Sequence, residues 1–139
     1  MMTKTMILLV FAAVCVSAAP PDDTDKILLM GLFDALNDTI KDLPNENIFL
    51  GDLKVKRHLS CTNEFFCQAQ AELKDKVSGL SGPMFEPFRT DKKIIRNLNS
   101  FNKRHEKTCK PADNVEILLY EFLEDLIKCV QKRIQYIPK

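Results

Sequence analysis

Apolar residues recur at steps of three and four along four stretches of the chain, and each stretch predicts an amphipathic helix. The helices are expected over residues 22–43 and 63–77, after Thr90, and over residues 113–136. Thr62 and Thr90 can cap the second and third helices, because a threonine hydroxyl accepts a hydrogen bond from an unpaired N–H at a helix start. The side chains expected to face inward are, helix by helix, Leu29, Phe33, Leu36, Ile40 and Leu43 in the first, Phe66, Ala69, Leu73 and Val77 in the second, Ile94, Leu98, Phe101 and His105 in the third, and Val115, Leu119, Phe122, Leu126 and Val130 in the fourth. Phe85 and Phe88, in the loop between the second and third helices, are expected to plug the end of the bundle.

The connections between these helices predict how the chain is wound. The segment 44–60 is long enough to run the whole length of a helical bundle. A short extended piece is expected within it, at residues 53–55. A second crossover, before the fourth helix, requires the third helix to end early, after Asn102, since the segment up to residue 113 then reaches about 35 Å. We therefore expect this early end and an all-α helical bundle in the order up, up, down, down.

The N-terminal segment predicts export. Lys4 precedes an apolar run over residues 6–16, and small residues follow it, which is the layout of a cleaved signal peptide. We expect cleavage after Ala18, with Ala19 as the alternative, so that residues 1–18 are the signal and residues 19–139 the mature domain. The run is shorter than the roughly 20 residues that cross a bilayer, so the mature protein is expected to be secreted and extracellular, without membrane insertion.

Removal of the signal also takes Cys15, and the count of cysteines falls from five to four. An even number in an oxidising compartment predicts two disulfides, each adding about 2 to 4 kcal/mol to stability. Spacing alone leaves three pairings open, although a bridge between the first two cysteines would close a very short loop. The four cysteines are Cys61, Cys67, Cys109 and Cys129.

Charge is balanced overall but divided along the chain. The net charge is +1, and loss of Lys4 brings it close to zero, so nucleic acid is not an expected partner. Residues 22–52 hold eight acids and two bases, whereas residues 89–110 hold eight bases and two acids. Both segments are amphipathic, so we interpret the blocks as charged outer faces of folded helices. The acids opposite the first apolar stripe are Asp34, Asp38 and Asp42, and the bases opposite the third are Lys92, Arg96, Lys103 and Lys107.

No catalytic or metal-binding pattern emerges. His58 and His105 are the only histidines, and their spacing is not that of metal ligands. The segment 79–82, Gly-Leu-Ser-Gly, lacks the Gly-x-Ser-x-Gly frame of a nucleophile elbow. We therefore expect no enzyme, no metal and no cofactor. Asn37-Asp38-Thr39 is the single N-glycosylation sequon, and its place at the flank of the first helix makes Asn37 a candidate glycosylation site.

Several motifs resemble one family. They are Phe-Cys-Gln-Ala at 66–69, Lys-Ile-Ile-Arg-x-Leu at 93–98, Cys109 with Pro111, and the start of the fourth predicted helix. Together they resemble the interleukin-4 and interleukin-13 cytokines, especially the fish type that stands for both, over residues 22–136. The resemblance implies a monomeric short-chain four-helix bundle cytokine in the up, up, down, down order. Its implied function is to bring together cell-surface cytokine receptor chains in type 2 immune signalling.

The resemblance also implies a disulfide pairing. Cys67, at the start of the second helix, matches the family cysteine that is joined to the one before the fourth helix, here Cys109. That match leaves Cys61 and Cys129 as the second pair. Cys129 departs from the family pattern because it lies inside the fourth predicted helix.

In the family, the first receptor chain binds the outer faces of helices one and three, where an acid and an arginine dominate. Gapless alignment puts Gly31 at the position of the acid, so the nearest acids are in the following turns. Lys103 replaces the arginine, which removes bidentate pairing with a carboxylate. Oppositely charged faces suit fast and specific docking. The receptor-binding residues implied for this first site are Asp34, Asp38, Arg96, Lys103 and Arg104.

A second receptor chain is implied near the end of the fourth helix. There, Arg133-x-x-Tyr136 resembles an Arg-x-x-Tyr pair of interleukin-4, two residues out of register. Tyr136 could instead pack over the end of the bundle. The alternative function is a secreted helical carrier with an apolar cavity for a small ligand, since a cavity leaves no mark on a sequence.

Overall fold

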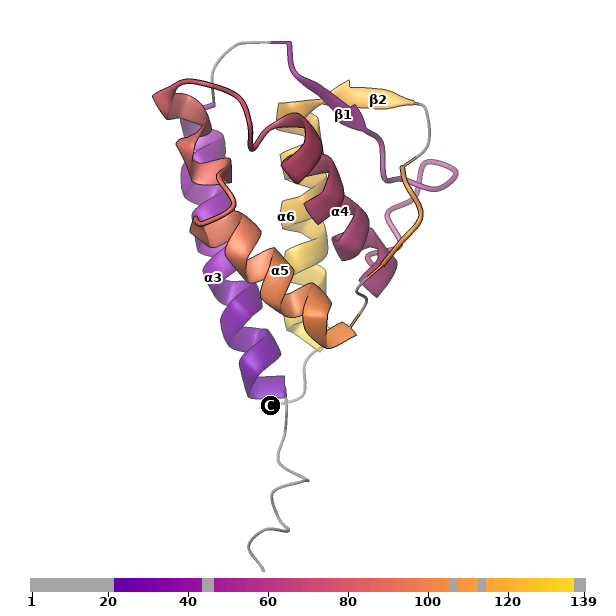
Figure 1. Cartoon of the computed structure of the whole chain (residues 1–139). Coiled ribbons are helices and arrows are strands. Elements are labelled where there is room, and N and C mark those ends of the chain that lie inside the picture. Colours follow the sequence, from indigo (N-terminus) through magenta and orange to yellow (C-terminus); the bar gives the residue numbers. More distant parts are fainter. Residues whose placement is uncertain (1–21, 44–46, 106–107, 113–114, 137–139) are drawn as a thin grey trace, which may run out of the picture.

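The computed structural model describes residues 22–43, 47–105, 108–112 and 115–136. The described chain is mostly helical and contains two disulfides, as predicted, and it adds a small two-stranded sheet that the sequence did not predict (Figure 1). The predicted signal peptide lies outside the described residues. The elements are α3 (Asp22–Lys41), β1 (Phe49–Gly51), α4 (Asn63–Lys76), η1 (Pro83–Phe88), α5 (Lys93–His105), β2 (Glu116–Leu118) and α6 (Leu119–Tyr136).

The start of α4 follows the predicted capping. The Thr62 hydroxyl oxygen accepts a hydrogen bond of 3.3 Å from the Phe65 backbone N–H. The cap predicted for the third helix is wrong, because α5 starts at Lys93 and Thr90 lies in the turn before it. The predicted early end of that helix is also wrong, since α5 continues to His105.

The late start of α6 supplies the second crossover instead. The fourth helix was expected from residue 113, but α6 begins at Leu119 and the three residues before it form β2. These residues are extended because β1 pairs with them, with Leu50 opposite Ile117 in an antiparallel register. The extended piece expected at 53–55 therefore lies a few residues earlier, in β1.

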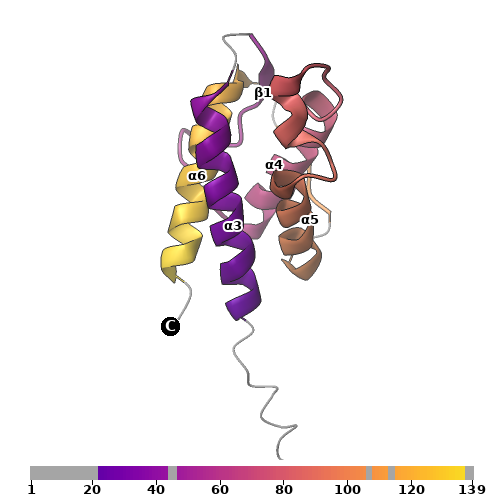
Figure 2. The ribbon, with the colours of Figure 1, turned by 90° about the vertical axis from the view of Figure 1, so that its left-hand side faces the viewer.

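The helices run in two directions. The Asn97 side-chain amide of α5 donates to the Leu28 carbonyl of α3, while Arg104, later in α5, reaches Asp25, earlier in α3. These two contacts make α5 antiparallel to α3, and α4 is antiparallel to α5 in the same way (Figure 1). Figure 2 shows α3 between α5 and α6, and α6 runs opposite to α3. The first two helices thus share one direction and the last two share the other.

One hydrophobic core lies between the four helices. Most of the predicted inward-facing residues are buried, and so are Phe85 and Phe88 of η1, which confirms the predicted plug. Three details differ. Leu32 is more deeply buried than Phe33, and His105, at the last residue of α5, is exposed. Val115 is 63% exposed because it precedes a strand rather than lying in a helix. The predicted residues with no more than 4% exposure are Leu29, Leu36, Phe66, Ala69, Leu73, Val77, Ile94, Leu98, Phe101, Leu119, Phe122, Leu126 and Val130.

Two disulfides fasten the connections to the helices. Cys61, just before α4, is bonded to Cys129 of α6, and Cys67 of α4 is bonded to Cys109 in the segment that leads to β2. These are the two pairs that the family resemblance implies, of the three pairings that the cysteine spacing left open. Cys129 is fully buried, which explains its place beside the apolar stripe of α6.

Ion pairs of Lys54 link the first crossover to α6. The Lys54 amine lies 2.9 Å from Asp125, 3.1 Å from Asp52 and 3.5 Å from Glu121. Burial lowers the pKa of this amine, but hydrogen bonds to Asp125 and Asp52 outweigh burial, so the pKa is raised above its ordinary value. The charged amine therefore stabilises the folded chain.

The replacement Gly51→Ala should destabilise the protein. A Cβ at Gly51 would lie 2.6 Å from the Ala112 Cβ and 3.1 Å from the Glu72 carboxylate, which accepts a hydrogen bond from the Gly51 N–H. We expect a loss of about 1 to 3 kcal/mol in the free energy of unfolding, measured by denaturant titration. The control is Gly79→Ala, where a Cβ has no neighbour within 4 Å. Equal stability of the two variants would contradict this packing.

The replacement Lys54→Met should cost about 2 kcal/mol at neutral pH, since it leaves the buried carboxylate of Asp125 and the half-buried one of Asp52 without their partner. A raised folded pKa means that the stabilisation is complete below the unfolded pKa of about 10.4 and is lost as the pH rises through the folded value. The difference from the parent protein should therefore be constant at neutral pH and shrink at strongly alkaline pH. Lys132→Met, at an exposed site of α6, is the control. A difference that stays constant throughout would be incompatible with this account.

Candidate functional site

α3 and α5 pack side by side, and we call their solvent-exposed sides together the α3–α5 face. Gly31 lies where the two helices approach closely, because a Cβ there would be 2.8 Å from the Asn97 amide nitrogen and 3.2 Å from the Lys93 side chain. A glycine leaves room for both of these side chains. The position at which the family resemblance places an acid is therefore occupied by a helix contact, and a carboxylate on this face has to come from another turn.

The solvent side of α3 combines apolar and acidic residues. Ile27 and Met30 are 70% and 49% exposed, and Asp34 and Asp38 are exposed one and two turns further on. Steps of three and four place all four on one side of the helix. The predicted acids are thus continuous with two exposed apolar side chains that the sequence analysis did not single out. The helical spacing of Ile27 and Met30 from Asp34 could have revealed this exposed group. Both residues lie outside the buried apolar stripe from which the helix was predicted.

The solvent side of α5 is basic. Arg96 and Lys103 are both exposed and lie seven residues apart, which places them on one side of the helix. Within the described part of the chain, no ion pair involves either side chain. Asp34 and Lys103 do not lie side by side across the two helices, however. Because the helices are antiparallel and Gly31 faces Lys93 and Asn97, Asp34 lies near the start of α5 and Lys103 near its end.

Arg104, predicted for the same face, has an internal partner. Its Nε donates to Asp25 at 2.8 Å, and the His105 Nε2 lies 2.8 Å from the second oxygen of the same carboxylate. Asp25 is only 8% exposed. The sequence did not single out Asp25, because the contact between the first turns of α3 and the last turn of α5 depends on antiparallel packing. This cluster connects the two helices that carry the face.

Arg133 lies apart from that face, at the same end of the molecule. Its guanidinium is 5.6 Å from the Phe66 ring centroid and 5.3 Å from that of Phe101, and it donates to the Asn63 side chain at 2.9 Å. Burial lowers the pKa of the Arg133 side chain, although the charge of Asp25 opposes the effect. The side chain of Tyr136, predicted beside Arg133, lies outside the described residues.

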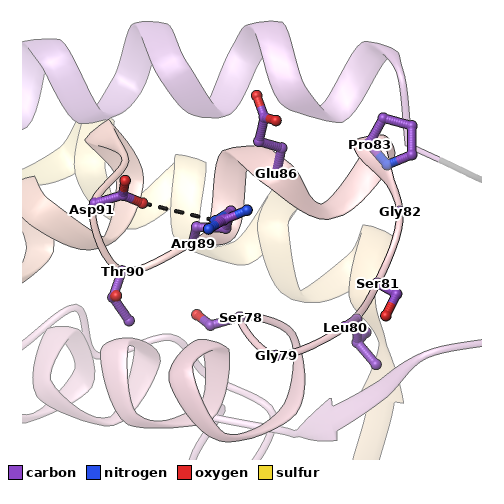
Figure 3. Close-up of a pocket in the computed structure, with 10 residues that line it drawn as sticks. All are labelled: Ser78, Gly79, Leu80, Ser81, Gly82, Pro83, Glu86, Arg89, Thr90 and Asp91. Carbon is purple, nitrogen blue, oxygen red and sulfur yellow. Dashed lines mark ion pairs between the residues drawn. The ribbon is translucent and has the colours of Figure 1, made fainter.

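A hollow of about 790 Å³ lies at the turn between α4 and α5, and it contains the Gly-Leu-Ser-Gly segment (Figure 3). Its lining is mainly polar and includes Ser81, Thr90 and the ion pair of Arg89 with Asp91 at 4.0 Å. No histidine or cysteine is among its lining residues, so Ser81 has no such side chain beside it in the hollow. Nothing in this hollow therefore assembles a nucleophile with a histidine base.

Among the described residues, no group of three or more histidine, cysteine, aspartate or glutamate side chains is placed to hold a metal ion. None of the helices that the structure describes is both long and apolar enough to pass through a membrane. Comparisons with protein-family models, curated proteins and solved structures give no significant match.

The replacement Asp25→Asn should destabilise the helical end that carries Arg104 and His105. It removes the charge from a buried carboxylate that bonds both side chains, and hydrogen bonds to charged groups contribute about 1.5 to 3 kcal/mol. Partial exposure of Arg104 reduces this effect. We expect a loss of about 2 kcal/mol by denaturant titration. Asp38→Asn, at an exposed site of the same helix, should change stability by less than about 0.5 kcal/mol. Equal effects of the two would refute the structural role of Asp25.

Proposed function

We propose that this protein is a secreted immune cytokine that binds cell-surface cytokine receptor chains and brings them together, in type 2 signalling of the interleukin-4 and interleukin-13 kind. The observation that carries the proposal is the α3–α5 face. It has exposed apolar side chains next to carboxylates on one helix, and on the neighbouring helix it has exposed cations, Arg96 and Lys103, that form no ion pair with any described residue. This observation agrees with what the sequence motifs imply.

The arrangement of the helices supports the same proposal. Two helices in one direction followed by two in the other, with a long connection before α4 and another before α6, is the up, up, down, down winding of helical cytokines. The strands β1 and β2 lie in those two connections and pair with each other. Two disulfides add support for an exported protein, because disulfides persist in oxidising compartments.

The residues of the face suit a protein partner. Exposed apolar side chains surrounded by charged ones are the usual composition of a binding site, with an apolar centre that supplies affinity and charges that steer the encounter. Ile27 and Met30 offer the centre, and Asp34 with Asp38 replaces the acid that Gly31 cannot supply. On α5, Arg96 and Lys103 offer the complementary charge. Arg104 is engaged with Asp25 and takes part as a positioning residue.

A second receptor chain is proposed at the end of α6. Because Arg133 is held by two aromatic rings and by Asn63, its role in this proposal is to shape that end of the molecule. Direct contact is then left to Tyr136 and its neighbours.

The carrier alternative receives less support. Large side chains fill the centre of the molecule, where Phe66, Phe101 and Phe122 are at most 2% exposed. The hollow at the α4–α5 turn is mainly polar and lies at the surface, so it suits an apolar ligand poorly. Native mass spectrometry of the purified protein would reveal a copurified lipid, which would favour the carrier.

The decisive experiment adds the folded protein to leukocytes of the source animal and measures tyrosine phosphorylation at the receptor. We expect phosphorylation within minutes, and none with protein that has been reduced and alkylated. Absence of a response together with absence of binding to receptor ectodomains would refute the proposal.

Reversal of charge at both Arg96→Glu and Lys103→Glu should slow association with the first receptor chain. Both side chains are exposed, so the fold should be retained, and steering should weaken most at low salt, where screening is least. We expect a loss of about tenfold or more in the association rate constant, measured by surface plasmon resonance. Lys128→Glu with Lys132→Glu on α6 is the matched control. Unchanged association at low salt would rule out this face.

A further inference from the structure

A second surface lies on the other flank of α5, between that helix and α4. It is an open groove of about 550 Å³. The two helices contribute amide side chains to it, Gln70 from α4 and Asn99 with Asn102 from α5. Lys74 and Lys103 lie on opposite helices along the same groove. The groove therefore has polar amides between two cations.

The amides of the groove are held in place by one another. The Gln70 side chain donates to Asn99 at 3.1 Å and accepts from Asn102 at 2.8 Å, and Asn102 also donates to the Phe66 carbonyl at 3.0 Å. The Cys67–Cys109 disulfide contributes to the same wall. The groove is thus a preformed feature, and a ligand that binds there does not have to order it.

Among the described residues, no carboxylate neutralises the positive charge of the groove. None of its described lining residues is acidic, and within the same part of the chain neither Lys74 nor Lys103 forms an ion pair. Asp75 follows Lys74 in the sequence, but a step of one residue turns it away from the groove by about 100°. The two ammonium groups are therefore available to an anion from solution.

The charge continues beyond the groove along α5. Arg96 and Lys103 lie seven residues apart on the same side of α5, about 10 Å along its axis, and Lys92 lies just before the first residue of the helix. Lys92 is 3.9 Å from Glu86, but both side chains are largely exposed, so this pair is weak. No acid occurs in α5 itself. The result is a line of cations, which we call the α5 cationic line, defined by Lys92, Arg96 and Lys103 with Lys74 beside it.

We propose that the groove and the α5 cationic line bind a sulfated polysaccharide of the cell surface or extracellular matrix. A line of separated cations beside hydrogen-bonding amides matches a linear polymer that carries regularly repeated sulfates and hydroxyls, and basic patches of this kind bind heparin. The proposal rests on the export predicted from the N-terminal segment, and it does not depend on the receptor assignment. The two surfaces share Arg96 and Lys103, whereas Lys74 belongs to the groove alone.

The test uses heparin as the probe and the full secreted protein as the binder. Affinity is measured by surface plasmon resonance over a series of salt concentrations, because each cation that contacts a polyanion releases counterions and steepens the salt dependence. The double variant Lys74→Gln with Lys103→Gln should elute from immobilised heparin at lower salt. The slope of log affinity against log salt should fall by about one for each lysine removed. Circular dichroism checks that the variant is folded.

The matched control is Lys128→Gln with Lys132→Gln, which removes the same charge from exposed positions of α6. It should retain the parental slope and elution. Equal losses in the two double variants, or no loss in either, would overturn the proposal, because binding would then reflect overall charge or another surface. Equally good competition by polyglutamate or by duplex DNA at the same charge concentration would also overturn it, since the groove would then not select a sulfated polysaccharide.

Discussion

The antiparallel packing of α5 between α3 and α4 is the constraint on which the rest of the structure depends. On one side, the Asn97 amide bonds to the Leu28 carbonyl and Gly31 leaves room for the approach. On the other side, the Asn102 amide bonds to the Phe66 carbonyl. Both surfaces to which we assign binding lie along these two contacts. A shift of α5 along its axis would therefore alter the α3–α5 face and the groove between α4 and α5 together, and with them both proposed binding surfaces.

Burial decides what each charged residue of this region can do. Asp25 is buried, so it engages Arg104 and His105 and holds helices together. Arg133 lies over aromatic rings and is likewise engaged. Residues such as Lys103 remain in water, and solvated cations are the ones that can exchange their counterions for a partner. Charge counted along the chain does not separate these cases, because the environment of each side chain is set by a distant helix.

The second crossover is present, but the helix boundary from which it was predicted is wrong. A second crossover was predicted by ending the third helix after Asn102, yet α5 continues to His105 and the length comes from the late start of α6. The cause is β2, which pairs with β1, with Phe49 opposite Leu118. The two strands are far apart in the sequence. Because their pairing keeps residues 116–118 extended, no local pattern in the sequence could predict this conformation.

The helical character, most of the core, the number of disulfides and the cap at Thr62 could be predicted from the sequence, because they follow from short-range periodicity, hydrogen bonding and cysteine count. The exposed acids and bases of the α3–α5 face could also be predicted from helical spacing. The fold was needed to show that Gly31 is a helix contact, that Arg104 bonds to Asp25, and that amides and lysines from two helices line one groove. The reason is physical: these features are contacts between segments tens of residues apart, and chain folding, not local preference, brings them together.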